Sequence, residues 1–220
     1  MSSVWHHFEA GGWAMYLILF WLICAIAVIA ERTVYLVSAT VNKDVFLATM
    51  QKCILAGDVA KAVKMCSAEN APLARIVQAG LVKVNRPDEE VQAAMDEAAL
   101  REMPRINKRT GYLGLFSNLA MLCGLFGTIV GLIKAFSAVG GENVDPSTKA
   151  ALLAHGISEA MNCTAFGLLA AIVALMGFAF LNGKTQGLED DINEASVHVL
   201  NLVVANRQKV NLQGIEAAAE

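Results

Sequence analysis

The sequence predicts an all-α membrane protein whose three transmembrane helices are joined by helical segments outside the membrane. Three stretches, 10–30, 111–133 and 160–182, contain no Asp, Glu, Lys, Arg or His. Each reaches the length of about 20 residues that an α-helix needs to cross a hydrocarbon core. The whole chain is 56 % hydrophobic and 17 % charged, whereas ordinary soluble domains carry about 25 % charged residues. Length and composition therefore agree on three spans.

Residues 1–31 are assigned to an outer N-terminus and the first transmembrane helix. No Lys or Arg precedes the apolar stretch, and the stretch is longer than the apolar region of a secretory signal peptide, so we expect a retained helix. Trp13, Tyr16 and Trp21 lie in its outer part, and Trp5 precedes them. Aromatic rings anchor in the headgroup region, which fits an outer helix end.

The distribution of basic residues predicts the orientation. Most of the 17 Lys and Arg residues lie in segment 32–110, residues 1–31 have none, and between the second and third spans there are only Lys134 and Lys149. Basic residues near spans mark the cytoplasmic side of a membrane. We therefore expect the N-terminus outside, segment 32–110 inside, a short loop outside and the C-terminal tail inside.

Segment 32–110 is predicted to be a cytoplasmic helical domain. A first helix is expected at 41–56, where Gly57 stops it. Asp58 is a suitable N-cap for a second helix at 59–67, since its side chain can accept hydrogen bonds from the first turn.

Two prolines mark the starts of the next two helices. Pro72 can occupy the first turn of a helix. Pro87 is followed by three acidic residues, which favour the positive end of a helix dipole. The helix after Pro87 is expected to run toward Arg109 and to continue into the second span, with Pro104 producing a kink or a local break.

The remaining residues are divided by the same criteria. The expected segments are a second transmembrane helix at 111–136, a short periplasmic loop with the start of the third helix at 137–155, a third transmembrane helix at 156–183, and a cytoplasmic C-terminal helix and tail at 184–220. The tail is predicted to be either an extension of the third span or a separate amphipathic helix.

Small residues form a stripe on each of the second and third spans. Their spacings of three, four and seven residues place them on one helix face. Small residues let membrane helices approach closely. The stripes therefore have two interpretations: packing of these two helices against each other, or the lining of a pore that also holds another protein's helix. The residues predicted for the second role are Ser117, Gly124, Gly131, Ala160, Gly167 and Ala171.

Each stripe also contains a threonine, Thr128 or Thr164. A threonine hydroxyl can bond water, a protonated carboxyl group or the carbonyl of its own helix. At a rise of about 1.5 Å per residue, both threonines fall in the outer half of the membrane and can face one site. A proton relay normally needs an ionisable group inside the membrane, and the three stretches hold no Asp, Glu or His. If the chain conducts protons, a partner must supply the carboxylate.

Other candidate sites are few. Glu159 borders the third span and is either a solvated residue at the headgroups or a carboxylate at the entrance of an ion path. The 5 cysteines are odd in number and form no Cys-x-x-Cys pair, so we expect no disulfide framework, metal site or cofactor. His155 and Ser158 lie in no Gly-x-Ser-x-Gly motif, which disfavours an intramembrane protease, and we expect no enzyme. A membrane scaffold without ion conduction remains an alternative to a channel subunit.

Two motifs resemble those of the MotA/TolQ/ExbB proton-channel family. Residues 124–132 (Gly-Leu-Phe-Gly-Thr-Ile-Val-Gly-Leu) resemble its Leu-Gly-Thr-Val-x-Gly segment. Residues 156–168 (Gly-Ile-Ser-Glu-Ala-Met-Asn-Cys-Thr-Ala-Phe-Gly-Leu) resemble its Gly-Ile-x-Glu-Ala-x-x-x-Thr-Ala-x-Gly-Leu motif. The segments 31–32, 72–75 and 105–115 also fit the ExbB/TolQ branch.

The resemblance implies a function. It implies a homopentamer in the bacterial inner membrane, enclosing two copies of a single-span ExbD/TolR-like partner and acting as the stator of a motor driven by the proton-motive force. The partner's intramembrane Asp would carry the proton beside Thr128 and Thr164, and Glu159 matches the motif's glutamate. An apolar cavity with two hydroxyls favours protons over sodium, and no role with nucleic acid is implied.

The chain departs from the family pattern at two positions. Met121 follows Ala120, and Val173 follows Ile172, where the family often has proline. Because proline kinks helices, the bends of both spans are expected to differ from the family. The departures fit a specialised branch such as the stators of gliding machinery, and three spans instead of four argue against the flagellar MotA branch.

Overall fold

The computed structural model describes residues 11–140 and 146–206, and every regular element in that part of the chain is an α-helix. Three of its helices are long and apolar enough to cross a membrane, which confirms the predicted fold class. The chain divides into two compact units. We call residues 1–32 and 109–181 the span unit, and residues 33–108 and 182–220 the amphipathic unit.

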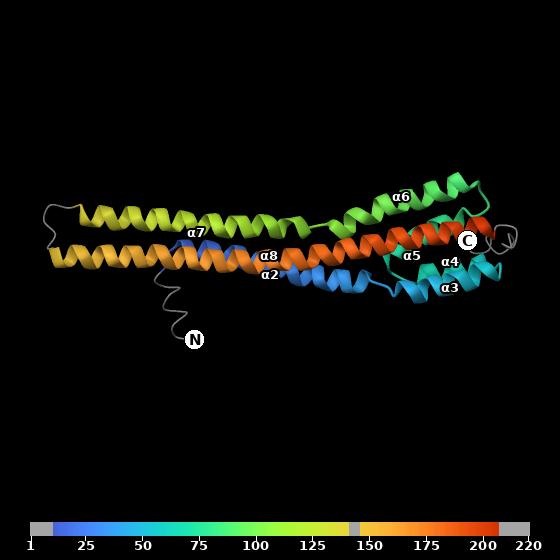
Figure 1. Cartoon of the computed structure of the whole chain (residues 1–220), viewed down its shortest axis with the longest axis horizontal. Helices are drawn as coiled ribbons and strands as arrows, with labels where there is room; N and C mark the ends of the chain where they lie inside the picture. Colours follow the sequence, from blue (N-terminus) through green and yellow to red (C-terminus); the bar gives the residue numbers. More distant parts are fainter. Residues whose placement is uncertain (1–10, 141–145, 207–220) are drawn as a thin grey trace. The chain divides into compact units, whose positions relative to one another are not determined.

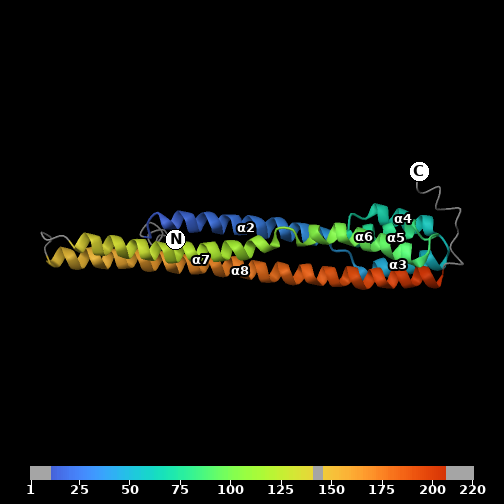
Figure 2. The same cartoon turned by 90° about the horizontal axis from the view of Figure 1, so that it is seen from above.

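The span unit is built from α2 (Ala14–Ala39), α7 (Thr110–Val139) and α8 (Pro146–Ala205), of which α2 and α8 continue beyond it. Figure 1 shows α7 antiparallel to the first part of α8. Figure 2, turned by 90°, shows α2 running beside them. The predicted positions of Trp5 and the residues after 206 fall outside the described part of the chain.

Small residues form the contact between α7 and α8. An added Cβ atom at Gly167 would lie 2.9 Å from the Cα atom of Gly124, and one at Gly131 would lie 3.3 Å from the Cβ atom of Ala160. The Ser117 hydroxyl donates a hydrogen bond to the carbonyl of Ala171, with 3.0 Å between the oxygens. The first interpretation of the stripes, packing of the two helices against each other, is therefore confirmed.

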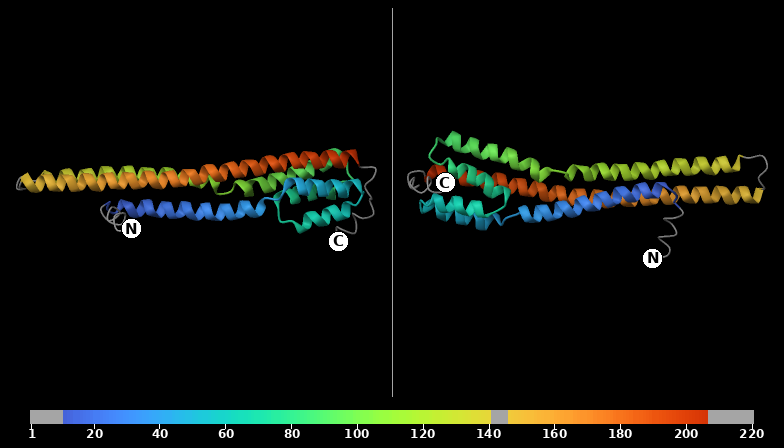
Figure 3. Two further views of the ribbon diagram at one scale, coloured as in Figure 1. Left: turned by 60° about the horizontal axis from the view of Figure 1, so that its bottom comes forward. Right: turned by 180° about the vertical axis from the view of Figure 1, so that it is seen from behind.

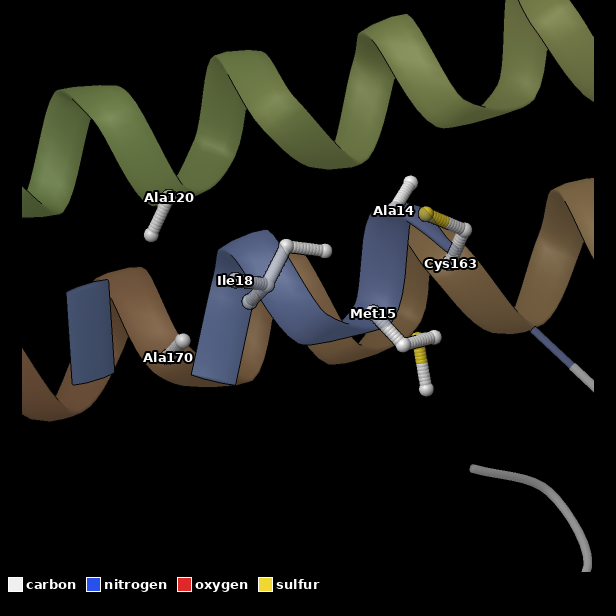
Figure 4. Close-up of a cluster of buried hydrophobic side chains, with 6 residues drawn as sticks. All are labelled: Ala14, Met15, Ile18, Ala120, Cys163 and Ala170. Carbon is white, nitrogen blue, oxygen red and sulfur yellow. The ribbon is translucent and has the colours of Figure 1, made fainter. Parts of the chain in front are cut away.

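Helix α2 packs against both of the other helices in the span unit. Figure 4 shows Ala14, Met15 and Ile18 of α2 gathered with Ala120 of α7 and with Cys163 and Ala170 of α8. Around this cluster the Trp13 ring meets Phe126 edge to face, with 6.2 Å between centroids, and Trp21 stacks on Phe116 at 5.6 Å. Aromatic rings therefore supply the larger contacts of α2 and of Trp13 just before it, while small residues supply the closest ones.

The amphipathic unit contains four complete helices: α3 (Lys43–Leu55), α4 (Val59–Ala68), α5 (Pro72–Val82) and α6 (Asp88–Asn107). Figure 3 shows them from two further sides. The predicted start signals act as expected. The Asp58 carboxylate accepts a hydrogen bond from the backbone N–H of Lys61, with 3.0 Å between N and O, and Pro72 occupies the first turn of α5.

Large aliphatic side chains fill the core of the amphipathic unit. Ile54 of α3 and Ile76 of α5 have no exposed surface, and Leu81 is almost as deeply buried. Consecutive helices from α3 to α6 pack against one another in chain order. This unit therefore has the inward-facing apolar core of a protein in water.

The junction between α6 and α7 differs from the prediction. The helix does not continue into the span: α6 ends at Asn107, and Arg109, with φ 67°, adopts the left-handed conformation before α7 begins at Thr110. Pro104 does not break the helix and lies within α6. A right-handed helix excludes a residue with left-handed backbone. The helix is therefore interrupted at Arg109 and not at Pro104.

The described part of the C-terminal segment, up to residue 206, continues the helix of the third span, which was one of the two predicted forms. Helix α8 runs without interruption from Pro146 to Ala205. Buried apolar residues recur along its last part at spacings of three and four: Ile192, Ala195, Val199 and Val203. This spacing is typical of an amphipathic helix, so the same helix changes from an apolar to an amphipathic pattern along its length.

Candidate ion path in the span unit

The two threonines lie within about one helical turn of each other along the α7–α8 contact. The Thr164 hydroxyl on α8 donates to the carbonyl of Gly124 on α7, with 3.3 Å between the oxygens. Thr128 lies one turn along α7 from Gly124, and its hydroxyl donates to the carbonyl of Leu125 at 2.6 Å. Both threonine residues are half-buried. The hydroxyls are therefore at the margin of the contact and not sealed within it.

Both threonines lie on the margin that faces away from α2. The neighbouring residues Gly127 and Cys163 mark the margin on the α2 side, because a Cβ at Gly127 would meet Ala14 of α2 and Cys163 belongs to the cluster around α2. One residue along an α-helix turns the side chain by about 100°. Thr128 and Thr164, each one residue further on, therefore lie across the contact from α2. The stripes predict that the two threonines lie on one side of the contact. Which side this is depends on the position of α2 in the structure.

Glu159 lies on the other side of the same contact. Its carboxylate oxygen Oε1 is 3.7 Å from Nζ of Lys134, and 20 % of its side chain is exposed. The carboxylate fills the space where a side chain at Gly12 would begin, and Gly12 has φ +70°. The structure therefore brings the two threonines together and places Glu159 beside the start of α2. A single path through all three residues remains a prediction.

The six small residues predicted to line a pore are buried in the α7–α8 contact of one chain. This set consists of Ser117, Gly124, Gly131, Ala160, Gly167 and Ala171. Packing between the two helices is sufficient to explain their small size. Their contact with another protein's helix stays a prediction.

Two residues beside Glu159 were not singled out from the sequence. Lys134 contacts Glu159, and Gly12 leaves room for its carboxylate. The sequence contained a signal for Lys134, since it is one of only two basic residues between the second and third spans. It contained none for Gly12, whose importance depends on a neighbour that is distant in the chain.

A second ion pair lies at the other end of the span unit. Nη1 of Arg109 donates to the Glu31 carboxylate at 2.5 Å, and the next residue, Arg32, is buried. This pair joins the end of the first span to the residue with left-handed backbone before the second. Among the described residues, no group of three or more His, Cys, Asp and Glu is arranged to hold a metal ion.

Comparison with known proteins gives consistent results. The chain is 26 % identical to a putative biopolymer transport protein ExbB homolog of Methanothermobacter thermautotrophicus, over 88 % of this chain and 67 % of that protein. It is 35 % identical to the Tol-Pal system protein TolQ of Haemophilus influenzae over 44 % of this chain and 42 % of that protein. It is 31 % identical to the putative biopolymer transport protein ExbB-like 1 of Synechocystis sp. over 79 % and 68 %.

The family model of the MotA/TolQ/ExbB proton channel family matches residues 68–194, which include both threonines and Glu159. Together with three apolar helices, this match identifies a multi-pass protein of the inner membrane, on the ExbB/TolQ-like branch. The matched region covers more than half of the sequence, and the chain belongs to the MotA/TolQ/ExbB proton channel family.

Proposed function

We propose that this chain is the channel-forming stator subunit of a motor in the inner membrane that is driven by the proton-motive force and powers an envelope process. It acts with a single-span ExbD/TolR-like partner that carries an intramembrane Asp. The chain transports ions and is not an enzyme. The family match and the names of the relatives support an energy-coupling role.

One observation carries the proposal: two hydroxyls lie within about one helical turn of each other on one margin of a membrane helix pair that has no acid of its own there. Thr128 and Thr164 meet this description. The apolar stretches around them contain no Asp, Glu or His. A proton pathway needs an ionisable group at membrane depth, so the carboxylate belongs to a partner helix beside the two threonines.

The hydrogen bonds of the threonines fit this role. Each hydroxyl already donates its proton to a backbone carbonyl, and each oxygen keeps the ability to accept. A protonated carboxylic acid is a donor. The threonines can therefore bind the protonated form of the partner's Asp and stabilise it in the apolar span.

The proposed assembly is the one that the family resemblance implies. Five copies of this chain surround two copies of the partner, with membrane lipid outside. The N-terminus is periplasmic and the C-terminus cytoplasmic. Protons are transported in preference to sodium, and the chain needs no metal or organic cofactor.

The proposed topology can be tested by labelling. A cysteine introduced at Glu90, in the cytoplasmic segment, should resist a membrane-impermeant label in intact cells. A cysteine at Asn143, which lies outside the described residues, should react.

The decisive experiment measures proton flux in liposomes that contain the chain with its partner. The double variant Thr128→Val, Thr164→Val keeps the side-chain volume nearly constant and removes both hydroxyls. We expect normal assembly with the partner and loss of most of the flux. The matched control, Thr128→Ser with Thr164→Ser, keeps the hydroxyls and should conduct.

Two outcomes would contradict the proposal. Wild-type flux from the valine variant would show that both threonines act only in packing. An absence of flux in the wild-type complex would favour the alternative, a membrane scaffold that assembles other proteins without conducting ions. The absence of an acid within the apolar stretches of this chain is the observation that keeps this alternative in view.

A further inference from the structure

We propose that Lys134 is a positioning residue for Glu159: it holds the Glu159 carboxylate at the start of α2 and so prevents a free negative charge from trapping cations at the outer end of the span unit. The proposal rests on the proposed transport function. It adds a residue whose role neither motif of the family resemblance includes.

The first step is the geometry of three elements that meet at one carboxylate. Glu159 of α8 lies 3.7 Å from Nζ of Lys134 near the end of α7. On its other side, Gly12 just before α2 presents bare backbone to the same carboxylate. Gly12 has φ +70°, a conformation that other residues adopt only with strain. The carboxylate is therefore held between a cation and a backbone position that favours glycine.

The second step concerns charge. The Glu159 side chain is four-fifths covered, with 20 % of its surface exposed. A carboxylate removed from water needs a compensating charge or hydrogen bonds. Among the described residues, Lys134 is the cation within ion-pair distance. The other outer lysine of this region, Lys149, lies almost three turns before Glu159 on α8.

The third step concerns the side of the α7–α8 contact on which the ion pair lies. The pair lies on the α2 side of the α7–α8 contact, across from Thr128 and Thr164. Without Lys134 the carboxylate loses its anchor and keeps its charge, and it can bind cations that should pass to the partner's acid. Removing the charge of Glu159 should then remove the defect. This predicted suppression distinguishes positioning from a general structural role of Lys134.

The test uses the complex with its partner in liposomes and compares proton flux among four variants. Lys134→Met should lower flux about fivefold, which corresponds to about 1 kcal/mol in a rate. Lys134→Arg keeps the cation and should conduct as the wild type does. Glu159→Gln should have a smaller effect than Lys134→Met, and the double variant Lys134→Met, Glu159→Gln should match Glu159→Gln alone. Lys149→Met is the matched control for the loss of an outer positive charge and should leave flux unchanged.

The outcomes separate this proposal from the transport function. If the wild-type complex does not conduct, the transport function fails. If it conducts and Lys134→Met conducts equally well, or if the two substitutions lower flux additively, the positioning role fails by itself. If Lys134→Met does not assemble, Lys134→Gln takes its place, because it removes the same positive charge and keeps a polar side chain. Its defect should also disappear with Glu159→Gln, and a defect that persists would overturn the proposal.

Discussion

The two units of this chain bury opposite kinds of residue. In the span unit the closest contacts are made by glycine, alanine and serine, and large side chains such as Phe20, Ile23 and Leu122 are exposed. In the amphipathic unit the covered residues are large and aliphatic, as at Ile54 and Ile76. One sequence therefore follows two packing rules, and the change occurs within single continuous helices.

The difference reflects the solvent that each unit faces. In water, covering a large apolar side chain lowers the free energy, so such residues gather inside. In lipid there is no such gain, and helices associate through close van der Waals contact and hydrogen bonds. The bond from the Ser117 hydroxyl to the Ala171 carbonyl is an example from the span unit. The amphipathic unit adds ion pairs between its helices to its apolar core, such as the one between Arg75 and Glu102.

The largest effect is expected where the span unit has least space. A side chain at Gly167 would meet backbone atoms of α7, with 2.9 Å to the Cα atom of Gly124 and 3.0 Å to the carbonyl oxygen of Ala120. Backbone atoms cannot rotate away, so Gly167→Leu should force α7 and α8 apart, at a cost of about 3 kcal/mol or more. We expect little monodisperse protein by gel filtration in detergent.

The matched control for Gly167 is Gly114 on α7, where an added Cβ meets nothing within 4 Å. Gly114→Leu should purify as the wild type does. Gly131→Leu, whose Cβ would lie 3.3 Å from a side-chain atom of Ala160, should fall between them. Equal behaviour of all three variants would show that the small residues do not set the distance between the helices.

Much of this fold could be predicted because its signals are local. Asp58, Pro72 and Pro87 mark helix starts through the chemistry of the first turn, and the three apolar stretches identify the spans. The end of the helix before Arg109 could not be predicted, because an arginine does not indicate a left-handed backbone at this position. The same is true of the site. The motifs indicate Thr128 and Thr164, whereas the contacts of Glu159 with Lys134 and Gly12 depend on how three distant segments pack.

The second expected effect lies in the amphipathic unit, at the buried carboxylate of Glu102. Nη1 of Arg105 donates to it at 2.6 Å and Nη1 of Arg75 at 3.3 Å, and 7 % of the Glu102 side chain is exposed. Glu102→Gln keeps the shape and removes the charge, which should cost about 1–2 kcal/mol. The apparent melting temperature in detergent should fall by about 4 °C.

Glu97 provides the control for Glu102, because its pair with Arg101 is exposed on both sides. Glu97→Gln should change stability by less than about 0.5 kcal/mol. If both substitutions lower the melting temperature equally, burial does not account for the importance of the Glu102 network.

The third prediction uses the reactivity of a buried thiol in the amphipathic unit. Burial raises the pKa of Cys66 from 9.0 to about 12, which lowers its thiolate fraction at pH 8 by about a thousandfold. Cys66 should therefore resist alkylation in the folded protein, while an exposed cysteine placed by Ala68→Cys should react quickly. Peptide mass spectrometry distinguishes the two sites. Rapid alkylation of Cys66 would show that this core opens readily.

The raised pKa of Cys66 also fixes a pH dependence. The unfolded thiol ionises near pH 9.0 and the folded one near pH 12, so the contribution of the protonated thiol to stability is complete below pH 9 and declines as the pH rises toward 12. The unfolding free energy of Cys66→Ala should have a flatter slope in this range than that of the wild type. An unchanged slope would mean that other groups cause the alkaline loss of stability.

The smallest effect is expected for an ion pair at the surface of the amphipathic unit. Nζ of Lys43 on α3 lies 2.8 Å from a carboxylate oxygen of Asp191 and 2.8 Å from one of Glu194, both on α8. The hydrogen bond to Asp191, followed by that to Glu194, raises the pKa of Lys43 above its ordinary value of 10.5. A raised pKa means that the cation's contribution is complete below pH 10.5 and is lost only as the pH rises through the folded value. Changing the pH near neutrality therefore leaves the lysine charged.

Salt is the better probe of Lys43, since it screens exposed charges and leaves apolar packing in place. Lys43→Met should lower the melting temperature slightly at low ionic strength, and the difference from the wild type should vanish near 1 M salt, where the screening length is about 3 Å. Lys52→Met, at an exposed lysine on the same helix, is the matched control and should show neither effect. A loss that persists in high salt would assign Lys43 to the apolar packing of α3 against α8. The surface of the amphipathic unit would then be held together, like the interior of the span unit, by contact more than by charge.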